Sequence, residues 1–206
     1  MTSQNGLKYR FICEDCNNKL GTRYDIELNK FTLSLSMFLK STLQFPLVIK
    51  FKVKPVKLIK AVLGHILSCK ENIDESVFDK KVRDYLFDDN AKLNNDIKIF
   101  YWIYPYNESR IVRDFLLLRW RNGEKVRAFC QVLKYFPIAF LVTNQSKFDD
   151  LNELTIFKNF PIDKEIEIPI KLHDKKENDY PERVDDNTVL FMTKETGNSV
   201  LTKPKR

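Results

Sequence analysis

Two cysteines near the start of the chain have the spacing of a metal-binding pair. Cys13 and Cys16 are separated by two residues, and thiolates at this spacing can form one edge of a tetrahedral Zn²⁺ site. A closed site needs two further ligands. His65 and Cys69 lie four residues apart in a predicted helix, so they share a face and are the candidates for the second pair. The sequence therefore predicts zinc as a cofactor, with Cys13, Cys16, His65 and Cys69 as its ligands.

The second pair also has an ordinary structural interpretation. Cys69 can be the last apolar contact of its helix, and His65 can be a partly buried polar side chain. The remaining cysteine, Cys130, stands among apolar residues of a predicted strand, so we expect it in the core. Isolated cysteines of this kind fit a reducing, cytoplasmic location better than a disulfide framework.

Five lysines in the next part of the chain favour a cationic surface. Residues 49–54 alternate apolar residues with lysines, which predicts a strand with one buried face and one cationic face. Pro55 then begins a predicted helix, because the first helical position needs no backbone N–H donor. The candidate nucleic-acid-binding residues are Lys50, Lys52, Lys54, Lys57 and Lys60. The alternative is an ordinary solvated surface of the strand and the helix.

Residues 11–21 read F-I-C-E-D-C-N-N-K-L-G, and this segment resembles the closing part of the HNH-type endonuclease motif, L-C-x-x-C-N-x-x-K-G. The resemblance implies that the C-x-x-C is half of a structural zinc site and that Asn17 takes the last catalytic-metal position. Lys19 and Gly21 match the closing K-G, with Leu20 between them and the spacing from Asn17 shorter by one residue. It covers about a dozen residues of the chain.

The upstream half of that motif is not found in this sequence. It carries the first cysteine pair, the general-base histidine and the middle asparagine, whereas residues 1–12 contain neither histidine nor cysteine. Three interpretations stay open: the missing half is supplied elsewhere, the chain is a relative that lost catalysis, or the C-x-x-C is coincidental. The catalytic residues are unknown, with Asn17 as the one candidate that matches the motif.

Composition sets broad limits on the function. The chain has 206 residues, 43% of them hydrophobic, and a formal net charge of +7, which favours partners that carry phosphate. No apolar run approaches the roughly 20 residues that cross a bilayer, and no signal peptide is evident, so we expect no membrane partner. The phosphate-binding, dinucleotide-binding and H-E-x-x-H motifs are also absent from the sequence.

The distribution of apolar residues predicts helices first and strands afterwards. Helices are expected over residues 24–43, from Pro55, and over residues 74–87, the last with Asp74 as its N-cap and Val77 facing inward. A short strand is expected over residues 7–12, and further strands over residues 97–104, 111–121, 125–136, 138–143, 165–172 and 188–192. Asn122-Gly123 predicts a hairpin turn, and Pro169 predicts an edge position for its strand.

These elements predict an α+β protein. We expect a zinc-knuckle or HNH-like remnant with a helix over residues 1–45, and an α+β body over residues 46–206 whose later part is a mainly antiparallel sheet. Aromatic and basic residues alternate near the start of that sheet and either stack bases or belong to a half-buried strand. They are Phe100, Tyr101, Trp102, Tyr104, Tyr106, Arg110 and Arg113.

The leading functional hypothesis is a nucleic-acid-associated, HNH-related protein of bacterial or phage origin, acting in phage defence or counter-defence. The chain would have nuclease activity if the missing half of the motif is supplied elsewhere. The alternative is a non-enzymatic interaction protein, such as an inhibitor or a complex subunit, that uses a basic surface to bind an acidic protein. A third hypothesis is a sensor of a small molecule or nucleotide.

Overall fold

The structure is a computed structural model that describes residues 13–41, 44–69, 76–88, 90–121, 124–192 and 199–202. A continuous helical stretch opens it, formed by α1 (Glu14–Leu20), the π-helical turn η1 (Gly21–Asp25) and α2 (Ile26–Ser41). Its apolar side chains recur every three or four residues and are buried on one side: Leu20, Tyr24, Leu28, Phe31 and Leu35. The predicted helix is therefore confirmed, but it begins earlier, so the C-x-x-C occupies a helix start. The strand predicted for residues 7–12 lies outside the described residues.

The alternating lysine segment forms β1 (Val48–Val53), which pairs antiparallel with β7 (Ile166–Lys171) in a two-stranded sheet. Both strands are edges, as Pro169 predicts, and Pro169 lies opposite Lys50. α3 (Pro55–Ser68) follows β1 directly and is almost entirely buried. It packs against η1, α2 and α4, and so forms the centre of the helical layer.

α4 (Val77–Phe87) begins with a capping box. The Ser76 hydroxyl accepts the Asp79 backbone N–H at 3.1 Å, and the Asp79 carboxylate accepts the Ser76 N–H at 3.2 Å. This start corrects one prediction, because Val77 is 76% exposed and does not face inward. The predicted cap, Asp74, lies outside the described residues.

The larger sheet contains the remaining strands in the order β6-β2-β5-β4-β3-β8, and β9 pairs with the other part of β3. Every pairing is antiparallel, so the α+β prediction is confirmed. The strands are β2 (Lys98–Ile103), β3 (Ser109–Arg121), β4 (Glu124–Tyr135), β5 (Ile138–Thr143), β6 (Asn152–Glu153), β8 (Thr188–Phe191) and β9 (Ser199–Thr202). Residues 122–123, the predicted hairpin turn, lie outside the described residues.

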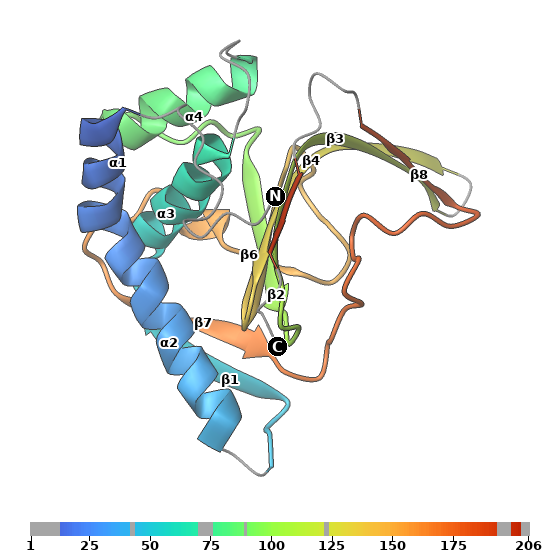
Figure 1. The fold of residues 1–206 in the computed structure, drawn as a ribbon, viewed down its shortest axis with the longest axis horizontal. Helices are drawn as coiled ribbons and strands as arrows, with labels where there is room; N and C mark the ends of the chain where they lie inside the picture. Colours follow the sequence, from blue (N-terminus) through green and yellow to red (C-terminus); the bar gives the residue numbers. More distant parts are fainter. Residues whose placement is uncertain are drawn as a thin grey trace.

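The two faces of this sheet are covered in different ways (Figure 1). One face packs on the helices and the two-stranded sheet, with Ile99, Leu133 and Phe140 in the shared core. The opposite face has a second core that contains Trp102, Phe115 and Cys130, as predicted for Cys130. The irregular segment of residues 174–186, here called the strap, leads from β7 to β8 and contributes Tyr180 to this second core.

A β-bulge divides β3 into an inner and an outer part. The register with β4 shifts between Val112 and Phe115, and Asp114 has φ 54° at the shift. The Asp114 carboxylate accepts a hydrogen bond from Gln131 Nε2 at 3.2 Å across the strands. Beyond the bulge, β3, β4 and β8 extend away from the helices (Figure 1). None of the helices in the described ranges has the length and apolar character needed to cross a membrane.

Candidate functional site

The two N-terminal cysteines lie at the first turn of α1. Cys13 is the N-cap, and its sulfur accepts the Cys16 backbone N–H at 3.3 Å. Hydrogen bonds from the Cys16 thiol and then from its backbone lower the pKa of Cys13, whereas donating to Cys13, followed by burial, raises the pKa of Cys16. Asn17 is exposed in the same turn. These shifts favour the thiolate form of Cys13 over that of Cys16.

The second candidate pair lies at the end of α3. His65 Nε2 is 3.5 Å from Asp25 Oδ1, and Cys69 ends the helix beside the Ser68 hydroxyl. In the part of the chain that the structure describes, no three His, Cys, Asp or Glu side chains are grouped to hold a metal ion. Zinc binding by these four residues therefore stays a prediction.

The five predicted lysines do not form one surface. Lys50 and Lys52 are exposed on β1, whereas Lys54 and Lys57 both lie within 3.0 Å of the Asp163 carboxylate. Lys60 is 3% exposed, and its ammonium group donates to the Tyr85 carbonyl and lies 4.4 Å from the centre of the Tyr85 ring. The prediction of a phosphate-facing surface is corrected at Lys60, because its charged group is buried.

The aromatic run near the start of the large sheet is buried. Trp102 is 4% exposed and Tyr104 is fully buried, so neither ring is available to stack on a base. Arg113 is also fully buried, and its guanidinium pairs with Asp79 across the helix–sheet interface. Of the two interpretations of this run, the packed strand is therefore correct.

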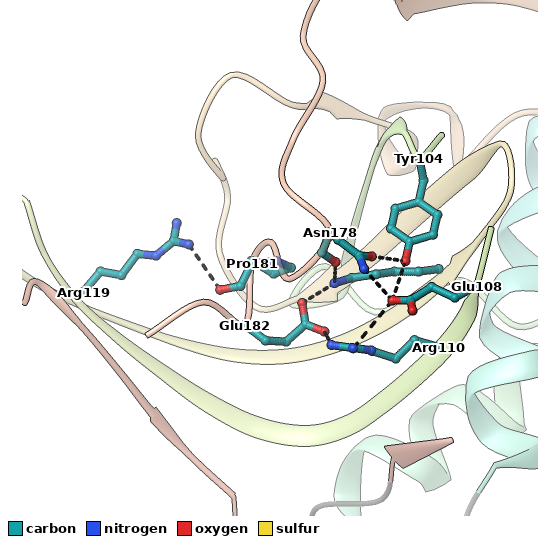
Figure 2. A network of polar contacts seen from close by, with 8 residues as sticks. Tyr104, Glu108, Arg110, Arg119, Asn178, Pro181 and Glu182 are labelled. Carbon is teal, nitrogen blue, oxygen red and sulfur yellow. Dashed lines mark hydrogen bonds and ion pairs between the residues drawn. The ribbon is translucent and has the colours of Figure 1, made fainter. Parts of the chain in front are cut away.

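A polar network fixes the strap to the sheet (Figure 2). Lys134 on β4 is fully buried and donates to the Asn178 carbonyl at 3.0 Å and to the Glu182 carboxylate at 2.6 Å. Glu108 accepts from the Asn178 side chain at 2.7 Å and lies 3.6 Å from the Arg110 guanidinium. Burial lowers the pKa of Lys134 and raises that of Glu182, and their mutual contact opposes both shifts.

A second set of contacts holds the strap further along β3. Arg119 donates to the Pro181 carbonyl at 3.3 Å (Figure 2). The same guanidinium pairs with the Asp149 carboxylate at 3.1 Å. The Tyr180 hydroxyl donates to the same carboxylate, and the Tyr180 ring packs edge-on against Trp102 at 5.4 Å. Beyond these contacts, the backbone N–H of Trp120 donates to the Asn187 carbonyl at 2.9 Å. The network therefore fixes the chain just before β8, and with it the position of β8 beside β3.

The outer parts of β4, β3 and β8 present a regular array of side chains, here called the outer face. Residues that pair directly across antiparallel strands lie on the same side of a sheet. The register places Phe129, Leu116 and Phe191 in one row, Arg127, Leu118 and Val189 in the next, and Lys125 beside Trp120 in the third. Adjacent strands are about 4.8 Å apart and successive rows about 6.7 Å. None of these positions holds an acidic residue.

Large rings on the outer face are exposed. Trp120 is 44% exposed, Phe129 is 64% exposed and Phe191 is 51% exposed, although each belongs to a strand of the main sheet. Lys125 and Arg127 are exposed beside them, and the Lys125 ammonium lies 5.3 Å from the centre of the Trp120 ring. Among the described residues, α1 to α4 lie toward the inner end of this side of the sheet, and none of these helices lies over its outer end (Figure 1). The site thus combines accessible aromatic rings with cations.

An alternating pattern in the sequence could have indicated this site. Lys125, Arg127 and Phe129 alternate with less exposed residues along one strand, and Trp120 stands at the matching position across the hairpin.

No protein-family model matches the chain, and no curated protein and no solved structure matches it either. A function for this chain is therefore inferred from the geometry of its own residues.

Proposed function

We propose that the chain binds single-stranded nucleic acid on the outer face. The observation that carries this proposal is the exposed aromatic array of Trp120, Phe129 and Phe191 with Lys125 and Arg127 beside it. Proteins that bind single strands combine aromatic side chains, on which bases stack, with cations that follow the phosphate backbone. A sheet surface suits this task because it holds its rings at fixed spacing on rigid elements.

Charge supports a polyanionic ligand. The whole chain carries a formal charge of +7, and on the outer face itself cations stand beside the rings without acidic residues among them. An acidic protein would also be attracted to these cations, but it would have little use for three exposed rings in a flat array. A paired duplex keeps its bases stacked on one another, so the rings favour an unpaired strand.

The first test measures binding of a fluorescein-labelled oligothymidylate by anisotropy at low salt. Base stacking on one aromatic side chain is worth about 1–3 kcal/mol, so Trp120→Ala and Phe129→Ala should each weaken binding about 5- to 150-fold. Phe45→Ala is the matched control, because Phe45 is an exposed ring (49%) outside the outer face. Absence of binding, or equal loss in the control, would overturn the proposal.

Salt dependence gives a second test of the same surface. Each phosphate contact that is lost reduces the slope of log affinity against log salt concentration by roughly 0.7 for a single strand. Lys125→Glu and Arg127→Glu should therefore weaken binding and flatten this slope, whereas Lys80→Glu on the exposed side of α4 should not. Binding that is insensitive to salt would favour the alternative of a protein-interaction surface for an acidic partner.

The zinc and HNH-related predictions are tested separately. Metal analysis of the purified chain should give about one zinc ion per protomer if Cys13 and Cys16 are ligands, and Cys13→Ser should remove it. The Lys50→Glu and Lys52→Glu variants test whether the exposed lysines of β1 extend the nucleic-acid surface. No bound metal would contradict the zinc prediction and leave the outer-face proposal intact.

A further inference from the structure

A cavity lies among α3, α4 and two loops, away from the residues of the outer face. It lies where residues 90–95, the first turns of α3 and residues 158–162 meet, and its volume is about 870 Å³. Sites for small molecules and cofactors have volumes of about 300–1,000 Å³. The cavity is therefore large enough for a ligand of nucleotide size, and it shares no lining residue with the outer face.

The polar part of the cavity is cationic. Lys92 and Lys158 line it, and Lys60 lies in its wall, whereas no acidic side chain does so among the residues that the structure describes. Lys158 Nζ donates to Asn95 Oδ1, which fixes the ammonium group at the cavity wall. Burial, and then the neighbouring Lys98, lower the pKa of Lys158. An anion bound beside this lysine would offset both effects.

The other part of the lining is apolar and accessible. Phe160 is 39% exposed and Ile162 is 37% exposed, and both contribute to the cavity wall. Side-chain amides also line the cavity, at Asn90, Asn94, Asn95 and Asn159. An aromatic ring suits the first part, hydrogen-bonding base edges suit the amides, and phosphate oxygens suit the lysines.

From this lining we propose that the cavity binds a nucleotide, with its base on Phe160 and its phosphates between Lys92 and Lys158. The lining supplies the three kinds of contact that such a ligand requires: an apolar wall, neutral amides and cations. Neither an uncharged nucleoside nor an inorganic polyphosphate can use all three. This site is independent of the outer face, so each can fail without the other.

The test measures binding of the four ribonucleoside triphosphates by isothermal titration calorimetry, with adenosine and inorganic triphosphate as partial ligands. At least one nucleotide should bind at least 10-fold more tightly than either partial ligand. Lys158→Glu and Lys92→Glu should each weaken nucleotide binding at least 10-fold. Lys30→Glu makes the same charge change on the exposed side of α2 and should leave binding unchanged, as should Trp120→Ala.

Each other outcome has a definite meaning. No heat of binding with any nucleotide would overturn the proposal. Equal affinity for inorganic triphosphate and nucleotide would overturn the assignment of a nucleotide, because the apolar wall would then contribute nothing. Equal weakening in Lys30→Glu would show attraction to net charge in place of a site. Phe160→Ala tests the contribution of the apolar wall, because it should weaken nucleotide binding without changing inorganic triphosphate binding.

Discussion

Each face of the large sheet has a buried ion pair, and these two pairs have different surroundings. On the helix side, Arg113 and Asp79 have no exposed side-chain surface, and Asp79 also caps α4. On the strap side, Lys134 is fully buried, whereas Glu182 retains 10% exposure and lies 3.9 Å from a second cation, Arg110. The first pair joins two regular elements, while the second joins a strand to an irregular segment.

This difference indicates two ways of covering a sheet. Helices satisfy their own backbone groups, so on that face the apolar residues of α4 pack in the shared core and the Asp79–Arg113 pair adds one link from α4 to β3. The strap has no such internal ladder, and its carbonyls at Asn178 and Pro181 are satisfied by side chains of the sheet, Lys134 and Arg119. We therefore expect loss of the helix-side pair to affect the whole fold and loss of the strap-side pair to affect mainly the strap and β8.

The largest effect is expected for Asp79→Ala. Removing Asp79 leaves the buried Arg113 guanidinium with a more distant carboxylate, Asp114 at 3.5 Å, so we expect a cost of about 3 kcal/mol, the lower end of the range for a broken buried pair. The free energy of unfolding from urea denaturation should fall by that amount, whereas Asp84→Asn on the exposed side of α4 should change it little. The apolar double variant Asp79→Leu with Arg113→Met should recover much of the loss. A loss below about 1 kcal/mol for Asp79→Ala would contradict the comparison.

A smaller effect is expected for Glu182→Gln. Lys134 keeps its bond to the Asn178 carbonyl, so the loss should be about 2 kcal/mol, typical of a hydrogen bond to a charged group. Hydrogen exchange read by mass spectrometry should accelerate in residues 174–191 and stay slow in α3. Oligothymidylate binding should also weaken, because β8 carries Phe191. Faster exchange throughout the helices would show that the two faces are not separable.

The pH dependence of the strap-side pair follows from its burial. Because burial raises the folded-state pKa of Glu182 above its ordinary 4.5, the unfolded chain releases this proton first as pH rises. The contribution of Glu182 to stability is therefore complete below pH 4.5 and declines as pH rises through the raised pKa of the folded state. The difference in unfolding free energy between the native chain and Glu182→Gln, measured by urea denaturation, should therefore be largest near pH 4.5, where the loss of about 2 kcal/mol is expected, and should become smaller as pH rises through the raised pKa. A difference that grows with pH there would contradict the stated direction.

The smallest effect is expected at an exposed pair near the start of α3. Hydrogen bonds from Lys57 and Lys54 lower the pKa of Asp163 to about 2, which an NMR titration of its carboxyl carbon can measure. This contribution to stability is present above 3.8 and is lost as pH falls through about 2. Since exposed pairs are screened by solvent, Asp163→Asn should shift the urea midpoint no more than Asp84→Asn does. A larger shift would show that exposed pairs also support this fold.

Local patterns in the sequence predict most of the secondary structure. The alternation of residues 49–54 specifies β1, Pro55 begins α3, and β-branched and aromatic runs locate the strands of the large sheet. Apolar spacing alone predicts that Val77 faces inward. The capping box makes Ser76 the N-cap, so Val77 is the first residue of the helix, and its side chain is exposed. The N-terminal helix begins earlier than predicted, because the C-x-x-C was interpreted as a zinc knuckle and not as the start of a helix.

The candidate sites could not be predicted in the same way. The pairing of Asp79 with Arg113 joins residues 34 positions apart, and no local pattern specifies it. The strands that carry Trp120 and Phe129 were predicted, but their exposure depends on where the helical layer ends. The nucleotide cavity combines three segments that are distant in sequence. Periodicity determines which side of a strand a residue occupies, whereas tertiary packing determines whether that side is covered.

The bulge at Asp114 has a consequence for how this protein can change. It separates the part of β3 that packs on helices from the part that carries Leu116, Leu118 and Trp120. Substitutions beyond it meet no helical core, so ligand preference on the outer face can be redesigned, or can diverge between relatives, without repacking the interior. A library that varies the outer-face positions should therefore retain far more folded members than one that varies the same strands before the bulge.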